Sequence, residues 1–244
     1  MDIVFYVLLF IVAFLYSAVG HGGASGYLAL MALYGVAPET MKPAALLLNL
    51  FVSLTSFIQY YRGRHFMFKI FLPLALASIP MAFLGGLVSI DASIYKKMLG
   101  VLLLIPALRF LVVKSDISEA ERKQAVLWIS ILIGAAIGYL SGLIGIGGGI
   151  LLSPILILLK WTNQKQTAAI SALFIFVNSF SGLAGQITKG IQFNNDIFVY
   201  VVIAFAGGLC GAYFGALKFK SNIIQYLLSA VLLIAAYKLI FASN

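Results

Sequence analysis

Residues 141–149 read SGLIGIGGG, with five glycines in nine positions between two strongly apolar runs. A weaker copy, SAVGHGGASG, occupies residues 17–26. Glycine in the middle of a helix lowers helix propensity by about 1 kcal/mol relative to alanine. Two such clusters in matching places therefore predict two breaks in apolar helices. We expect the two breaks to form one binding site together.

The composition around the clusters is that of an integral membrane protein. Of the 244 residues, 63% are hydrophobic and 9% are charged, whereas a soluble domain carries about 25% charged residues. The net charge of +9 lies mostly in short connectors between apolar runs, so we expect it to set membrane orientation rather than to bind nucleic acid. The one cysteine, Cys210, is expected to be a small buried hydrophobic residue.

The apolar runs are interpreted as helices, because a membrane span needs roughly 20 apolar residues. Two runs, 25–37 and 150–161, are too short to cross the roughly 30 Å hydrocarbon core. Re-entrant hairpins and full crossings both remain open, and we favour hairpins, since backbone breaks at membrane depth need cover from protein or water. The candidate helices are 3–19, 25–37, 43–61, 68–88, 93–113, 125–144, 150–161, 167–187, 197–217 and 223–241.

The chain divides into two halves that repeat. A first five-helix repeat is expected over 1–113, a cytoplasmic linker over 114–124 (KSDISEAERKQ), and a second five-helix repeat over 125–244. Besides the glycine clusters, Asn49 falls against Asn178 and Gln59 against Gln186, and PMAFLGGLV and GVLLLIPALRFLV each have a counterpart. Because five is odd, the second half enters the membrane from the opposite side, which makes the repeat inverted.

Charge gives this topology a direction. With the N-terminus outside, 11 of the 16 lysines and arginines fall in connectors on the inside, as the positive-inside rule expects. The five others are Lys42, Lys96, Lys97, Lys189 and Lys238. The predicted fold is thus an all-α, polytopic membrane protein of two inverted five-element repeats, with short or re-entrant helices at the glycine clusters.

The two clusters are the predicted site. A helix that starts after a glycine turn presents free backbone N–H groups and the positive end of its dipole, which favours an anion. Asn49 and Asn178 lie inside spans and serve either as donors to that anion or as structural bonds to a broken backbone. His21 is the titratable side chain within a cluster, and either contacts the anion or stabilises the turn. The predicted substrate-binding residues are Gly20, His21, Gly22, Gly23, Ser25, Asn49, Gly145, Gly147, Gly148, Gly149 and Asn178.

The positions of the acids argue against other chemistries. All seven Asp and Glu residues lie at helix ends or in connectors, which argues against a carboxylate proton relay and a cationic substrate. No nucleophile–base pair, HExxH motif or P-loop occurs, so we expect no enzyme, no metal and no cofactor. Lys42, at the start of a span, either draws anions to the outer mouth or snorkels to the interface.

SGLIGIGGGILLSP, the earlier SAVGHGGASG and the two-half arrangement resemble the TauE/SafE family of sulfite-exporter-like permeases. The resemblance covers nearly the whole chain and implies transport of small sulfur-containing anions or sulfonates. The first cluster departs from the more glycine-rich second one at His21 and Ala24, which leaves open whether both halves contribute equally to the site.

We therefore expect a secondary transporter of sulfite or sulfonates such as sulfoacetate, working by alternating access in the bacterial inner membrane. An anion channel on the same scaffold and a non-transporting accessory protein are the alternatives. The expected partners are the small anion and the lipid bilayer, with no nucleic acid, and a homodimer is one candidate assembly. The sequence leaves the particular anion, the direction, the coupling ion and the oligomeric state open.

Overall fold

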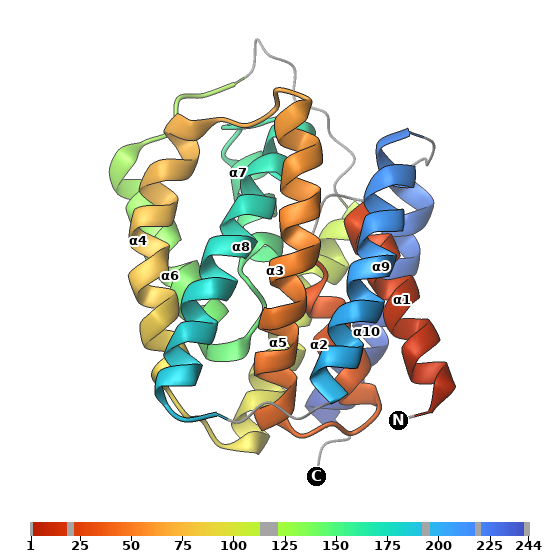
Figure 1. Cartoon of the computed structure of the whole chain (residues 1–244). Coiled ribbons are helices and arrows are strands. Elements are labelled where there is room, and N and C mark those ends of the chain that lie inside the picture. Colours follow the sequence, from red (N-terminus) through yellow and green to blue (C-terminus); the bar gives the residue numbers. More distant parts are fainter. Residues whose placement is uncertain (1, 19–21, 113–121, 192–195, 218–220, 242–244) are drawn as a thin grey trace.

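The computed structural model describes residues 2–18, 22–112, 122–191, 196–217 and 221–241, which form ten α-helices and no strand (Figure 1). The all-α expectation is confirmed, and each apolar run of the sequence corresponds to one helix. The helices are α1 (Ile3–Ala18), α2 (Ala24–Leu33), α3 (Pro38–Arg62), α4 (Phe68–Leu87), α5 (Ala92–Val112), α6 (Leu127–Ile144), α7 (Gly149–Leu158), α8 (Gln164–Thr188), α9 (Asp196–Leu217) and α10 (Ser221–Phe241).

The two longest helices have clear start signals in the sequence. A proline, Pro38, begins α3, where its fixed φ fits the first helical turn and its missing N–H costs nothing. A capping box begins α8: Asn163 accepts from the backbone N–H of Gln166, and the Gln166 side chain accepts from the Asn163 N–H. Both helices run for 25 residues, about 37 Å at 1.5 Å per residue.

Within the described residues, α3, α4, α6 and α8 are long and apolar enough to cross a membrane. The helices α2 and α7 have ten residues each, about 15 Å, and are shorter than the apolar runs that predicted them. They end at Leu33 and Leu158, a few residues before the ends expected from hydropathy.

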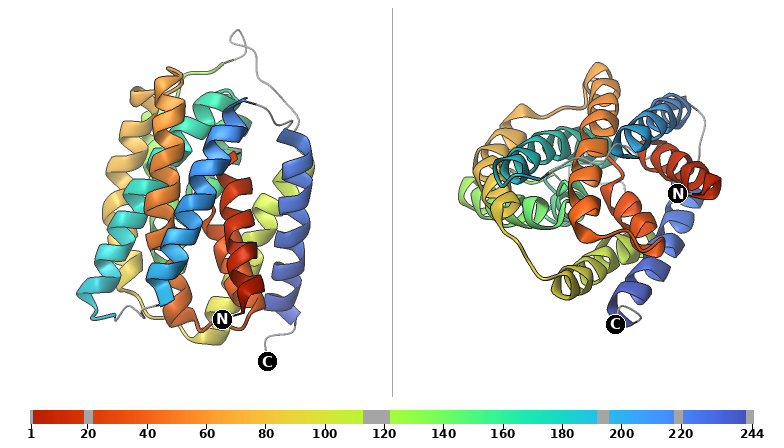
Figure 2. Two further views of the ribbon diagram at one scale, coloured as in Figure 1. Left: turned by 45° about the vertical axis from the view of Figure 1, so that its right-hand side comes forward. Right: turned by 60° about the horizontal axis from the view of Figure 1, so that its bottom comes forward.

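The antiparallel pair α3 and α8 forms the centre of the bundle (Figures 1 and 2). On one flank α4 packs against both α6 and α8, and on the other flank α9 packs against both α1 and α3. The helices α5 and α10 pack against each other. The short helices α2 and α7 lie inside this frame, and α2 is buried over nearly its whole length.

Glycines bring the flanking helices into close contact. On α6, Gly134, Gly138 and Gly142 lie against backbone carbonyls of α4, and a Cβ at any of them would clash with that backbone. On α9, Gly207 and Gly211 lie in the same way against α1. Such small-residue contacts let helix backbones approach in lipid, where no hydrophobic force drives association. Gly207 and Gly211 therefore serve the packing of α9 against α1.

Each short helix returns the chain to the end of the bundle from which the preceding helix came. The rings of Phe5, at the start of α1, and Tyr34, just after α2, lie 5.1 Å apart. At the other end, the N–H of Lys123, before α6, donates to the carbonyl of Lys160, after α7, at 2.9 Å. The pairs α1–α2 and α6–α7 are therefore two hairpins whose turns point into the bundle from opposite ends (Figure 2).

The described basic residues gather at two ends in the groups expected from the sequence. The "Lys42 end" holds Lys42, Lys96, Lys97, Lys189 and Lys238. The "Arg64 end" holds Arg62, Arg64, Lys69, Arg122, Lys123, Lys160 and Lys165.

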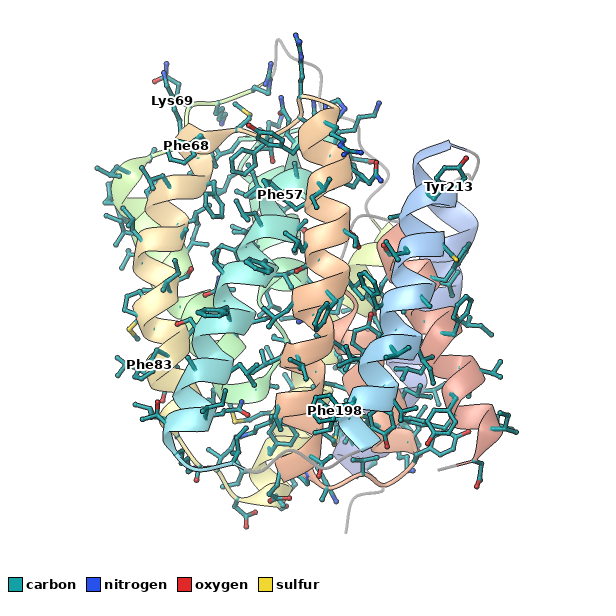
Figure 3. The ribbon with its side chains drawn as sticks, viewed as in Figure 1. Phe57, Phe68, Lys69, Phe83, Phe198 and Tyr213 are labelled. Atoms are coloured by element: carbon teal, nitrogen blue, oxygen red, sulfur yellow. The ribbon has the colours of Figure 1, made fainter. Side chains whose placement is uncertain are left out.

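Apolar side chains cover the outside of the bundle between these ends (Figure 3). Leu76 on α4 is 66% exposed and Val202 on α9 is 67% exposed, which is the surface that lipid requires. Cys210 is also exposed. The expectation that it is buried was wrong, because on a membrane helix an apolar run gives no sign of which face points to lipid.

Candidate functional site

The described turns of the two hairpins have backbone that favours glycine. We call residues 22–23 the first turn and residues 145–148 the second turn. Gly23 precedes α2 with φ of 91°, and Gly148 precedes α7 with φ of 77°. Gly145 and Gly147 are left-handed too, with φ of 89° and 73°. Only glycine adopts this region routinely, so the clusters are explained by backbone conformation.

Neither short helix has a side-chain cap at its N-terminus. The first N–H groups of a helix have no partner within it, and here they start inside the bundle, where residues 22–30 and 141–153 are all buried. These two helix starts carry the partial positive charge of the helix dipole. The arrangement suits a small anion.

The two turns meet at the midpoint of α3 and α8. A Cβ built on Gly22 would lie 2.8 Å from Cγ2 of Ile175 and 3.0 Å from Oδ1 of Asn49. A Cβ built on Gly147 would lie 2.5 Å from Nδ2 of Asn49 and 2.9 Å from the same Ile175 methyl. Both turns therefore contact the same two side chains. We call Asn49, Ser53, Ile175 and Ser179 the central cluster.

Hydrogen bonding in the central cluster is incomplete. Nδ2 of Asn49 donates to Oγ of Ser179 at 3.2 Å and so links α3 to α8. Oδ1 of Asn49 and Oγ of Ser53, one turn further along α3, have no partner among the described residues, and both side chains are fully buried. A buried polar group without a partner costs about 1–3 kcal/mol. Of the two, only the Ser53 hydroxyl can donate a hydrogen bond to an anion, because an amide oxygen only accepts.

Two more unpartnered hydroxyls lie beside the turns. Oη of Tyr27 is buried without a partner in the described residues, and a Cβ on Gly23 would lie 2.6 Å from it. Oγ of Ser141 is also unpartnered, and its Cβ lies 3.4 Å from a Cβ built on Gly148. Sequence reasoning missed Tyr27 as a candidate. The available signal was a lone tyrosine one turn after the glycines.

Other predicted site residues make bonds within the protein. Nδ2 of Asn178 donates to the carbonyl of Phe174 on its own helix at 2.8 Å, while its Oδ1 is unpartnered. Oγ of Ser25 donates to the hydroxyl of Tyr16 at 2.8 Å. The Asn178 bond is structural, but it goes to the residue's own helix and not to a broken backbone. Gly149 lies against Ile175, while Gly20 and His21 lie outside the described residues.

Buried tyrosines fasten both hairpins. Tyr16, on α1, accepts the bond from Ser25 on α2. Tyr95, on α5, donates from its hydroxyl to the carbonyl of Ile144 at 2.9 Å, at the end of α6 and directly before the second turn. Each turn is thus held by a side chain that lies outside it.

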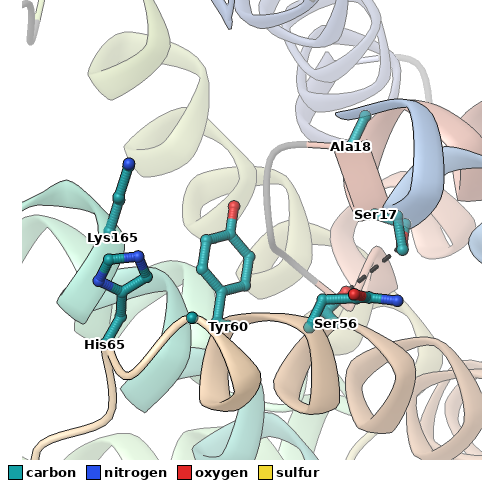
Figure 4. Close-up of a pocket in the computed structure, with 9 residues that line it drawn as sticks. Ser17, Ala18, Ser56, Tyr60, His65 and Lys165 are labelled. Atoms are coloured by element: carbon teal, nitrogen blue, oxygen red, sulfur yellow. Dashed lines mark hydrogen bonds between the residues drawn. The ribbon is translucent and has the colours of Figure 1, made fainter. Parts of the chain in front are cut away.

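A pocket of about 310 Å³ opens at the Arg64 end (Figure 4). Its floor holds the hydroxyl pair of Ser17 and Ser56, 3.3 Å apart, and its rim holds His65 and Lys165. Partial burial, followed by the positive charge of Lys165, lowers the pKa of His65. Because the positive charge of Lys165 disfavours further positive charge beside it, the rim favours a bound anion over a bound cation. We call it the Arg64-end pocket.

A smaller pocket of about 170 Å³ opens at the Lys42 end. Lys42 and Lys189 line it, together with Gln186 near the end of α8. We call it the Lys42-end pocket. No group of three or more His, Cys, Asp or Glu side chains that could hold a metal occurs among the described residues.

Comparison with known proteins agrees with this architecture. The family model described as sulfite exporter TauE/SafE matches residues 5–239. A probable membrane transporter protein of Sinorhizobium fredii is 33% identical over 235 residues, covering 95% of each chain. A probable membrane transporter protein of Methanocaldococcus jannaschii is 30% identical over 204 residues, covering 78% of this chain and 73% of the relative. No solved structure matches the chain.

Proposed function

The chain belongs to the sulfite exporter TauE/SafE family of membrane transporters, and from this membership we propose that it is a secondary transporter of small sulfur-containing anions. Sulfite and sulfonates such as sulfoacetate are the proposed substrates, and alternating access of two inverted halves is the proposed mechanism. The observation that carries the proposal is the meeting of two uncapped helix starts at Asn49, beside the buried and unpartnered hydroxyl of Ser53.

Paired contacts support the inverted repeat. Gly22 contacts Ile175, Asn49 and Ser53, while Gly147 contacts Asn49, Ile175 and Ser179. Exchanging Gly22 with Gly147, Asn49 with Ile175 and Ser53 with Ser179 converts one set into the other, at an offset of 125 or 126 residues. The contacts thus favour Ile175, rather than Asn178, as the counterpart of Asn49.

Helix packing follows the same exchange of the first half with the second. The exchange converts the packing of α4 against α6 into that of α9 against α1. The pairs α3–α8 and α5–α10 each contain one helix from each half, so the exchange leaves these pairs unchanged. The hairpins α1–α2 and α6–α7 enter from opposite ends. We infer from this arrangement that both hairpins are re-entrant in a membrane, with their turns near the midplane, as inverted-repeat transporters place their binding sites.

A line of polar and small residues connects the central cluster to each end. On α3, Asn49, Ser53, Ser56 and Tyr60 follow at helical spacing and reach the Arg64-end pocket. On α8, the corresponding line begins at Ile175 and runs through Ser179 and Gly182 to Gln186 in the Lys42-end pocket. Asn49, Ser53 and Ser179 are fully buried, so the central cluster is closed to both pockets. We assign the two lines as the two access routes.

The chemistry of the site favours an anion. Ser53, Ser141 and Tyr27 offer hydroxyl donors, and the two helix starts offer backbone N–H groups. Among the described side chains no carboxylate lies near the central cluster, since Asp2, Glu39 and Asp91 all lie at or next to helix starts. A cation would find no compensating charge there.

Uptake of radiolabelled sulfite or sulfoacetate into proteoliposomes tests the proposal. Wild-type protein should accumulate the anion against a gradient, and Gly148→Leu should abolish uptake. Loss in Gly148→Leu combined with wild-type uptake by Asn49→Leu would leave the asparagine structural. A channel, the second candidate, dissipates gradients but cannot accumulate substrate. Absence of flux for every sulfur anion tested would favour an accessory role.

A further inference from the structure

The Lys42-end pocket contains a donor that no described residue uses. Gln186 is 4% exposed, and its Nε2 is buried without a hydrogen-bond partner among the described residues. Gln186 lines the pocket, and an amide nitrogen can only donate. The unpartnered atom therefore points to an acceptor that the described chain does not supply.

Two lysines border the same pocket. Lys42 is partly buried, and its Nζ lies 4.9 Å above the ring of Tyr95. Lys189 is exposed, and Glu39 is the one carboxylate in the pocket wall. Neither lysine forms an ion pair within the described residues. The wall thus combines two ammonium groups with one carboxylate, and its net charge is positive.

Lys42, which lines the pocket, also lies against the second turn. The Cα of Lys42 lies 3.2 Å from a Cβ built on Gly145, whose φ is 89°. Tyr95, under the ammonium group of Lys42, donates to the carbonyl of Ile144 next to that turn. Lys42 thus connects the pocket to the turn that faces the central cluster.

We propose that this pocket is a second anion site, in which Lys42, Lys189 and Nε2 of Gln186 hold a small oxyanion on its way to or from the central cluster. The inference rests on the proposed transport function. The pocket volume of about 170 Å³ admits an ion of a few heavy atoms. Charge-assisted bonds from two ammonium groups and one amide N–H suit a sulfite or sulfonate group.

Calorimetric titration of the purified full-length protein with sulfite tests the site directly. In the Asn49→Leu background, where the central site is impaired, a weak site should remain. Adding Lys42→Met should remove that remaining binding, and Lys42→Arg should retain it. Lys97→Met is the matched control, because Lys97 lies at the same end but does not line the pocket.

Transport from a defined side separates this site from the proposed function. In proteoliposomes sorted for one orientation, Lys42→Met should raise KM about tenfold for substrate added at the Lys42 end, as expected for one lost charge-assisted bond. KM for substrate added at the Arg64 end should stay unchanged.

Four results separate the fate of the second site from that of the proposed function. Transport with an unchanged KM in Lys42→Met removes the second site and leaves the transporter intact. Equal effects of Lys42→Met and Lys97→Met reduce it to general surface charge. Binding that depends on Lys42 without any flux would keep the site and remove the transport proposal, while a wild type that binds no sulfite refutes both.

Discussion

The first turn and the second turn approach the same two helices but offer them different chemistry. The first turn faces the carbonyl end of the Asn49 amide and the unpartnered Ser53. The second turn faces the amide nitrogen of Asn49, which already donates to Ser179. Where the first half carries Asn49, the corresponding residue of the second half is the apolar Ile175.

The two turns therefore share a backbone conformation, while the side chains beside them play different roles. Both turns need glycine for their φ values, and both start a short buried helix. Only the α3 side leaves polar atoms of the central cluster without partners. Anion selectivity should therefore depend more on α3 than on α8.

The largest effect is expected from the second turn. In Gly148→Leu, the new Cβ would lie 2.8 Å from Ile137 and 3.0 Å from Phe174 at a φ of 77°. Backbone strain and steric overlap add, so binding and uptake should both fall below detection. Sulfite uptake measures the loss of the site, and the melting temperature measures the loss of stability.

Gly35 provides the matched control for this prediction. It has a φ of 71°, yet a Cβ there would meet nothing within 4 Å. Gly35→Leu should therefore cost only the strain of a left-handed residue, about 1–2 kcal/mol, and keep uptake. Loss of uptake in both variants would mean that fold stability, and not the site, explains Gly148→Leu.

The next effect should come from the amide of the central cluster. Asn49→Leu removes the bond that links α3 to α8 between the two turns and leaves the buried Ser179 without its donor. Leaving a buried polar group without its partner costs about 1–3 kcal/mol, so kcat/KM for sulfite should fall about 10- to 100-fold. Asn178→Leu should have a smaller effect, because the Asn178 amide donates to its own helix.

Exchanging the side chains of residues 49 and 175 tests whether the two halves are equivalent. The double variant Asn49→Ile with Ile175→Asn moves the amide to the corresponding position on α8, again between the two turns. If the halves are equivalent in backbone, the exchange should recover part of the activity that Asn49→Ile alone loses. Equal loss in the single and double variants would show that the surroundings of α3 are essential.

Much of the fold could be predicted from the sequence. Apolar runs predict every described helix. The glycine-rich residues 141–149 predict a break, because glycine is the residue that adopts left-handed backbone without steric cost. The short apolar runs 25–37 and 150–161 also favoured hairpins over full crossings, since runs of this length fall short of the hydrocarbon core.

The side-chain content of the site could not be predicted in the same way. Aligning Asn49 with Asn178 depends on residue identity, whereas the contacts pair Asn49 with Ile175 at an offset of 126. Whether Asn178 turns into the site or bonds its own helix at Phe174 depends on χ angles that no periodicity encodes. Tyr27 was missed for the same reason, because only tertiary packing leaves its hydroxyl unpartnered.

A smaller effect should separate the two serines of the central cluster. Ser53 has no partner among the described residues, so Ser53→Ala should leave the melting temperature unchanged or raise it while lowering uptake a few-fold. Ser179 accepts from Asn49, so Ser179→Ala should lower both the melting temperature and uptake. Identical melting temperatures in the two variants would contradict the assignment of Ser53 to the ligand.

The smallest effect concerns pH at the Arg64 end. Partial burial and Lys165 lower the pKa of His65 below its ordinary value of 6.5. Between the two values the unfolded chain binds more protons than the folded chain, so stability is full above pH 6.5 and falls as the pH drops toward the folded-state pKa. In His65→Gln this part of the pH dependence should disappear, and in Lys165→Met it should shrink, because one cause of the shift is gone. Melting temperatures measured from about pH 5 to 8 test this account. A His65→Gln curve identical to that of the wild type would contradict it.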